Sequence, residues 1–179
     1  CSINFVFGRL IYAAGVGTAG LEFAPGEGVR LAAGEYLTIV YQVDNRAGTS
    51  ELAFATAIEA KLGAPSDVTT ELEMVFTGTT SVSIPSDGMP HYVNGSCYPP
   101  EPQTFVGAIT LMGGTGVSQR LDHTAASGSS ATRIDAAFDP ADMQYLTFPR
   151  FTATSGDALY TTCNYVNSTG VTQIWGDRI

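Results

Sequence analysis

Apolar and polar residues alternate with a period of two over most of the chain, and Gly, Pro, Asn and Asp interrupt the alternation at short intervals. This pattern predicts β-strands that bury one face and are joined by turns. Near the C-terminus, Leu159, Thr161, Cys163 and Tyr165 are expected to share one face of a strand. Only Pro140–Met143 suggests a turn of helix. We expect strands at residues 3–14, 36–43, 52–58, 71–76, 80–84, 105–112, 117–121, 133–138, 146–151, 158–165 and 171–175, with a further short strand near Cys97.

Segments rich in Gly, Pro and small residues separate these strands. Gly113–Gly116 predicts the turn of a hairpin between residues 105–112 and 117–121. Thr124–Ser130 is expected to be a small-residue loop, and Pro85–Pro102 is expected to be a largely irregular one.

Tyr92, Tyr98 and the run Pro99–Pro102 give the longer of these two loops an aromatic and proline-rich character. Such loops on a rigid scaffold often carry recognition. The alternative is a loop that covers the edge of a sheet.

The sequence contains no internal repeat, no linker-like tract and no shift in composition. These observations predict a single domain over residues 1–179. Its expected fold class is all-β, a jelly-roll β-sandwich of about eleven mostly antiparallel strands with little helix.

Composition and charge narrow the choice of partners. The 179 residues carry a net charge of −9, with Lys61 as the one lysine and with no basic run. Nucleic acid and anionic membrane surfaces are therefore not expected partners. No apolar segment reaches the length of about 18 residues that a transmembrane helix requires.

The three cysteines indicate in which cellular compartment the chain is expected to reside. Cys97 and Cys163 lie in expected strands, and we predict a disulfide between them in an oxidising compartment; three reduced thiols are the alternative. Cys1 is not a translation start, so we expect that cleavage removed either a signal peptide or an upstream domain. Cys1 would then be free, linked to another chain, or lipidated as in an outer-membrane lipoprotein. The predicted location is secreted or cell-surface.

Three stretches of the chain, taken in order, carry a resemblance. They are residues 11–37, then Ile84–Pro85 with Cys97 and residues 105–116, and finally residues 138–176, which include Gly156–Tyr165. Together they resemble the C-terminal jelly-roll domain of the copper type II, ascorbate-dependent monooxygenases, the peptidylglycine and dopamine hydroxylase family. The resemblance implies a copper site made of histidines and a methionine.

This chain departs from that family at the ligand positions. Gln42–Val43 stands where the family has a His-Tyr pair, and Ile109–Gly114 stands where it has His-x-His. The family's methionine should follow Gly176, where the chain instead reads Asp177–Ile179. Copper of this type needs imidazole and thioether ligands. The weak alternative candidates for a metal site are His91, His123, Met112 and Met89.

Other catalytic motifs are not apparent. The sequence has no Gly-x-Ser-x-Gly elbow and no phosphate-binding loop, and Asp122–His123 has no defined serine partner. Two Asn-x-Ser/Thr sequons begin at Asn94 and Asn167.

The resulting functional prediction is an exported, non-catalytic binding or structural module that uses no cofactor and binds protein partners or its own copies. Self-assembly through the long apolar strand at residues 3–14 is one route. The alternative is a fragment of a copper-dependent monooxygenase, or a divergent member, that needs a partner domain.

Overall fold

The computed structural model describes residues 9–15, 20–39, 57–140, 142–143 and 145–174. The chain forms two compact units. The larger comprises Cys1–Leu21 and Met74–Ile179, and the smaller comprises Glu22–Glu73. The single domain over residues 1–179 stays a prediction.

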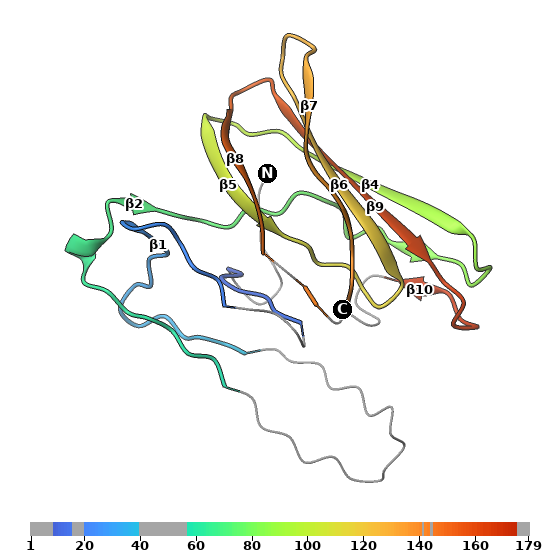
Figure 1. The fold of residues 1–179 in the computed structure, drawn as a ribbon, viewed down its shortest axis with the longest axis horizontal. Helices are drawn as coiled ribbons and strands as arrows, with labels where there is room; N and C mark the ends of the chain where they lie inside the picture. The colour runs from blue at the N-terminus through green and yellow to red at the C-terminus, as the bar shows by residue number, and fades with distance from the viewer. Residues whose placement is uncertain (1–8, 16–19, 40–56, 141, 144, 175–179) are drawn as a thin grey trace. The chain divides into compact units, whose positions relative to one another are not determined.

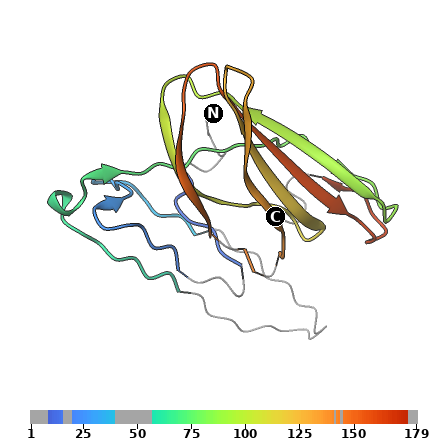
Figure 2. The same ribbon diagram turned by 45° about the horizontal axis from the view of Figure 1, so that its top comes forward.

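The larger unit is built from antiparallel strands. Its sheets are β4-β9-β6-β7, β5-β8 and β10-β3, and Figures 1 and 2 show the first of these as a row of neighbouring ribbons. The strands are β3 (Ser83–Ile84), β4 (Pro90–Cys97), β5 (Gln103–Ile109), β6 (Gly116–Thr124), β7 (Ser130–Ala137), β8 (Tyr145–Ala153), β9 (Ala158–Val166) and β10 (Gln173–Ile174).

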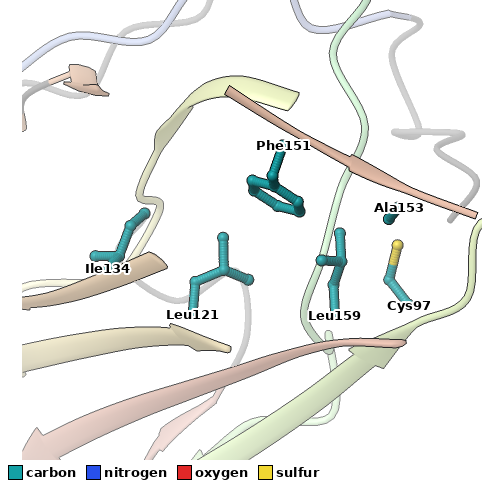
Figure 3. Packing of buried hydrophobic residues seen from close by; sticks show 6 residues of the cluster. All are labelled: Cys97, Leu121, Ile134, Phe151, Ala153 and Leu159. Atoms are coloured by element: carbon teal, nitrogen blue, oxygen red, sulfur yellow. The ribbon is translucent and has the colours of Figure 1, made fainter. Parts of the chain in front are cut away.

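The main hydrophobic core lies between the four-stranded sheet and the β5-β8 pair. In Figure 3, Leu121, Leu159 and Cys97 extend from the larger sheet toward Phe151 and Ala153 of β8. Ile134 and partly buried residues of β5 and β8 complete this core. Two layers of antiparallel strands with an apolar interior make a sandwich-like unit. The all-β prediction is therefore confirmed, whereas jelly-roll connectivity stays a prediction.

A second cluster closes one end of the unit. Ile84, Met112, Phe138 and Tyr165 are buried against one another. Met112, a candidate metal ligand from the sequence, thus serves as core packing.

The alternation of burial along β9 follows the sequence pattern. Leu159 and Tyr165 are buried while Tyr160 is exposed, because successive side chains of a strand point to opposite faces. The prediction that Leu159, Thr161, Cys163 and Tyr165 share a face is confirmed.

Two sequence-based predictions are wrong. The largely irregular loop expected at Pro85–Pro102 contains the eight-residue strand β4 at Pro90–Cys97, where only a short strand near Cys97 was expected. The expected hairpin around Gly113–Gly116 is also absent: the turn forms, with the Gly116 N–H donating to the Gly113 carbonyl at 2.9 Å. Its flanking strands do not pair, since β5 pairs with β8 and β6 pairs with β7 and β9. The chain instead crosses from one sheet to the other.

The smaller unit contains little regular structure among its described residues. β1 (Glu27–Gly28) pairs in parallel with β2 (Thr70–Glu71), and Pro65–Asp67 forms the short 3₁₀ element η1. Of the strands expected from the sequence, residues 36–39 and 57–58 of this unit, and residues 9–14 of the larger unit, carry none. The remainder of those three segments lies outside the described residues.

Candidate functional site

The surface of the four-stranded sheet that points away from the core carries polar and aromatic side chains in register. Across β4 and β9, Tyr92 pairs with Asn164, and Asn94 pairs with Thr162. Each of these positions has the opposite parity to the buried residue Leu159 or Cys97 of its own strand. We call this surface the outer face; it comprises Tyr92, Asn94, Ser96 and Tyr98 near β4, Tyr160, Thr162 and Asn164 of β9, Ser118, Arg120 and Asp122 of β6, and Thr132 and Asp135 of β7.

Arg120 is held in a fixed orientation at the centre of the outer face. Its Nε donates to Asp122 Oδ2 at 2.7 Å and its Nη2 donates to Asp122 Oδ1 at 3.0 Å. Nη2 also donates to Thr132 Oγ1 at 2.8 Å, and Nη1 lies 3.5 Å from Asp135 Oδ2. The hydrogen bonds from Arg120 lower the pKa of Asp122. The planar guanidinium and carboxylate therefore form a rigid pair whose Arg120 side chain is still 48% exposed.

Tyrosines lie at two ends of the outer face. Tyr92 is 66% exposed, and at the other end Tyr98 and Tyr160 are 56% and 43% exposed. The hydroxyls of Tyr98 and Tyr160 are hydrogen-bonded to each other. Tyr92 is opposite Asn164, and Asn164 is four residues from Tyr160 along β9. This separation corresponds to about 13 Å along the strand.

Between the tyrosines, the side chains present amide and hydroxyl groups. Thr162 Oγ1 donates to Asn94 Oδ1 at 2.9 Å, which fixes the orientation of the amide. On the other side of β9, Thr162 is in register with Arg120 of β6. The middle of the outer face is thus polar, and its side chains are preorganised by contacts with each other.

A second polar cluster is buried beneath the sheet. His123 Nε2 lies 3.1 Å from Asp157 Oδ2, and Arg133 Nη2 lies 3.1 Å from His123 Nδ1. Because the guanidinium can only donate, Nδ1 accepts and the proton of the neutral ring is on Nε2. The Phe151 ring stacks on His123 at 4.9 Å and lies 4.2 Å from the Arg133 guanidinium carbon. The three polar groups form one directional chain, packed on an aromatic ring.

A β-bulge explains why Arg133 faces inward. The β6–β7 register shifts between Leu121, which pairs with Ile134, and Asp122, which pairs with Thr132. Arg133 is the extra residue, so both it and Ile134 contact the interior side of the sheet while Thr132 faces out.

Asp157 ties this cluster to two loops. Its Oδ2 accepts from the Thr154 N–H at 2.9 Å, and its Oδ1 accepts from the Ala126 N–H at 2.8 Å. These two backbone bonds, followed by the contact with His123, lower its pKa to about 2. Asp157 therefore stays ionised and fixes the β6–β7 and β8–β9 turns. Its role in the described structure is to hold the fold together.

The structure does not bring the sequence-predicted metal ligands together. His91 is opposite Tyr165 on β9 and His123 is opposite Leu159, so six residues, or about 20 Å, separate them along that strand. His91 instead contacts Asp87 through Nε2 at 2.9 Å. Met89 is exposed and Met112 is in the core. Within the described ranges, no group of three or more His, Cys, Asp or Glu residues could hold a metal ion.

The predicted bridge between Cys97 and Cys163 is wrong. Cys163 is a free thiol opposite Val93, whereas Cys97 is opposite Leu159. Their positions differ by four residues along paired strands, or about 13 Å, which exceeds the roughly 7 Å between Cα atoms that a disulfide tolerates. Burial raises the pKa of the Cys163 thiol. Cys1, the predicted site of a lipid or an intermolecular link, lies outside the described residues.

Sequence reasoning identified two residues of the outer face but placed them in a loop. Tyr92 belongs to β4, and Tyr98 follows that strand directly. The signal that could have located the face is the period-two series Tyr92, Asn94, Ser96 and Tyr98. Arg120 was missed, and Asp122 was considered only as the neighbour of His123, because their contacts depend on the pairing of β6 with β7 and β9.

Comparisons with known proteins add no relatives. No family model, no curated protein and no solved structure matches this chain. The resemblance to the copper monooxygenases therefore stays a prediction. In the described part of the chain, no helix combines the length and the hydropathy that crossing a membrane requires.

Proposed function

We propose that this chain is a non-catalytic binding module and that the outer face is its ligand surface. The observation that carries the proposal is the fixed array on β4, β9 and β6. Exposed tyrosines on or next to β4 and β9 lie beside an Arg120–Asp122 pair of β6 and flank an oriented Asn94 amide. A surface whose polar groups are already oriented loses little side-chain entropy when a ligand binds.

The buried His123–Asp157 pair supports a binding role rather than catalysis. Its side chains are only 10% and 8% exposed. Both ring nitrogens of His123 are engaged, and both Asp157 oxygens accept backbone hydrogen bonds. These groups act as internal supports of the sheet that carries the outer face.

Binding to glycan and peptide arrays tests the proposal. The purified chain is applied to both arrays beside the variants Tyr160→Ala and Arg120→Ala, with Tyr36→Ala as the matched control. Tyr36 is 95% exposed and belongs to the smaller unit. We expect ligand spots that both outer-face variants lose and that the control keeps. Spots that the outer-face variants retain, or no spot on either array, would overturn the proposal.

Export of the module, predicted from the sequence, is part of this proposal. Fractionation of the source cells with an antibody to the chain tests it. The expected result is signal in the secreted or cell-surface fraction, and signal confined to the cytosol would contradict it.

A further inference from the structure

We infer that the ligand of the outer face is a neutral carbohydrate chain. This inference rests on the proposed function and specifies its ligand class.

The tyrosine rings suit the apolar side of a sugar. A pyranose ring exposes C–H groups on its faces and hydroxyls at its rim, and a tyrosine ring combines an apolar surface with a polar hydroxyl. Tyr92, Tyr98 and Tyr160 are each between 43% and 66% exposed, although they lie on a well-packed sheet. Strands β4 and β9 fix the backbone of Tyr92 and Tyr160, and Tyr98 directly follows β4, so little order has to be gained when a sugar stacks on them.

The centre of the face suits the hydroxyls of a sugar. Neighbouring hydroxyls both donate and accept, and they are matched by planar groups that hold donors and acceptors at fixed spacing. The Arg120–Asp122 pair and the Asn94 amide are such groups. Tyr160 is in register with Asp122, so one stacking ring and one planar pair are adjacent.

The dimensions of the face favour a chain over a single sugar. Tyr92 and Tyr160 are separated by about 13 Å along the strand, with Asn94 and Thr162 paired between them. Stacking positions at both ends and hydrogen-bonding groups in the middle accommodate a short oligosaccharide.

Charge argues against a nucleic acid as the occupant. Arg120 is the only cation of the outer face, and it is bonded to Asp122 and faces Asp135. The whole chain also carries a net charge of −9. Nucleic acid binding instead relies on several unpaired cations along the phosphate backbone.

The centre of the face also differs from a protein interface. Stable protein interfaces have an apolar core with a polar rim. Here the arrangement is reversed, because Asn94 and Thr162 lie between Tyr92 and Tyr160, with Arg120 next to Thr162 on β6. A polyhydroxylated ligand fits this order better than a peptide does.

Affinity electrophoresis in native gels tests the inference. Gels contain hydroxyethylcellulose, galactomannan, xylan, laminarin or dextran as neutral probes, or heparin as the anionic probe. We expect retardation in at least one neutral gel. Tyr92→Ala and Tyr160→Ala should weaken binding at least tenfold, whereas Tyr92→Phe and Tyr160→Phe, which retain the ring, should change it less than threefold. Tyr36→Ala should match the parent chain.

A variant is scored only if its melting temperature stays within 2–3 °C of that of the parent chain, which is expected for substitutions at exposed positions. This criterion separates loss of binding from loss of folding. Retardation by none of the neutral probes, by heparin alone, or equally in the alanine variants would overturn the inference. Peptide spots lost by the Tyr160→Ala and Arg120→Ala variants, without retardation by carbohydrate, would overturn the ligand class and leave the binding module standing. Failure of both assays would overturn both.

Discussion

Asn167 provides the sharpest test of the fold. Its side chain is completely buried, and all of its hydrogen-bonding capacity is used. Nδ2 donates to the Ile84 carbonyl at 2.9 Å and to the Val171 carbonyl at 2.8 Å. Oδ1 accepts from the Thr169 N–H at 3.0 Å and from Thr169 Oγ1 at 2.8 Å. The amide thus joins β3 to the loop between β9 and β10.

Replacing this amide should lower stability by an amount that the contacts define. Each of the four hydrogen bonds contributes about 1 kcal/mol net. Asn167→Ala should therefore lower the free energy of unfolding by about 4 kcal/mol, which corresponds to a fall of roughly 10 °C in melting temperature. Asn167→Asp keeps the shape but turns two donor contacts into oxygen–oxygen contacts with Ile84 and Val171. At pH 7 it should cost at least as much as the alanine variant.

The aspartate variant should also depend on pH. A buried carboxyl next to two carbonyl oxygens has its folded-state pKa raised above its unfolded value. Its charged form is then the one that destabilises the fold, so the deficit should be larger at pH 7 than at pH 4. The same carboxyl at an exposed position has no such effect.

Chemical denaturation at pH 4 and pH 7 measures both effects, with Asn94→Asp as the matched control. Asn94 Oδ1 already accepts from Thr162, and a carboxylate can keep that bond. A loss of less than 1 kcal/mol in both Asn167 variants, or a pH-independent deficit in Asn167→Asp, would refute the reasoning. The result also bears on the sequon at Asn167, because a glycan on Nδ2 would replace one of its two hydrogens and so remove one of the two hydrogen bonds that it donates.

Three further predictions concern other parts of the larger unit. The pKa of Asp157 is lowered to about 2 in the folded chain. The ionised carboxylate therefore stabilises the fold at any pH above the pKa that Asp157 has in the unfolded chain, and this stabilisation is lost as the pH falls through about 2. Asp157→Asn should therefore lower the melting temperature at pH 7 by an amount that shrinks between pH 4 and pH 2; a constant difference would contradict this. A Cβ at Gly95 would collide with the Gly78 backbone, so Gly95→Ala should cost about 1–3 kcal/mol in denaturant titrations, and a neutral effect would show that the segment at Gly78 packs elsewhere. Finally, copper titration followed by desalting should reveal no site that needs both His91 and His123, which pair with residues near opposite ends of β9; tight stoichiometric binding lost in either alanine variant would restore the copper hypothesis.

The local pattern of the sequence accounts for most strands of the larger unit. Residues 133–138, 146–151 and 158–165 were expected as strands, and each lies within or largely overlaps β7, β8 or β9. Burial on alternate residues is a property of the strand itself, so a single sequence records it. Only a short strand near Cys97 was expected where β4 forms, because Pro90 and Gly95 weaken its pattern, although its pairing with β9 is continuous over eight residues.

What the sequence by itself determined is the all-β class, the position of most strands and the inward face of β9. What only the tertiary structure decided is which strands are neighbours. β5 and β6 are adjacent in the chain yet belong to different sheets. The pairing of β4 and β6 with β9 separates His91 from His123 and Cys97 from Cys163. It also brings Arg120, Asp122 and the tyrosines onto one face. The physical reason is that strand pairing joins residues far apart in sequence, and period-two alternation specifies the buried face of a strand but not its partner.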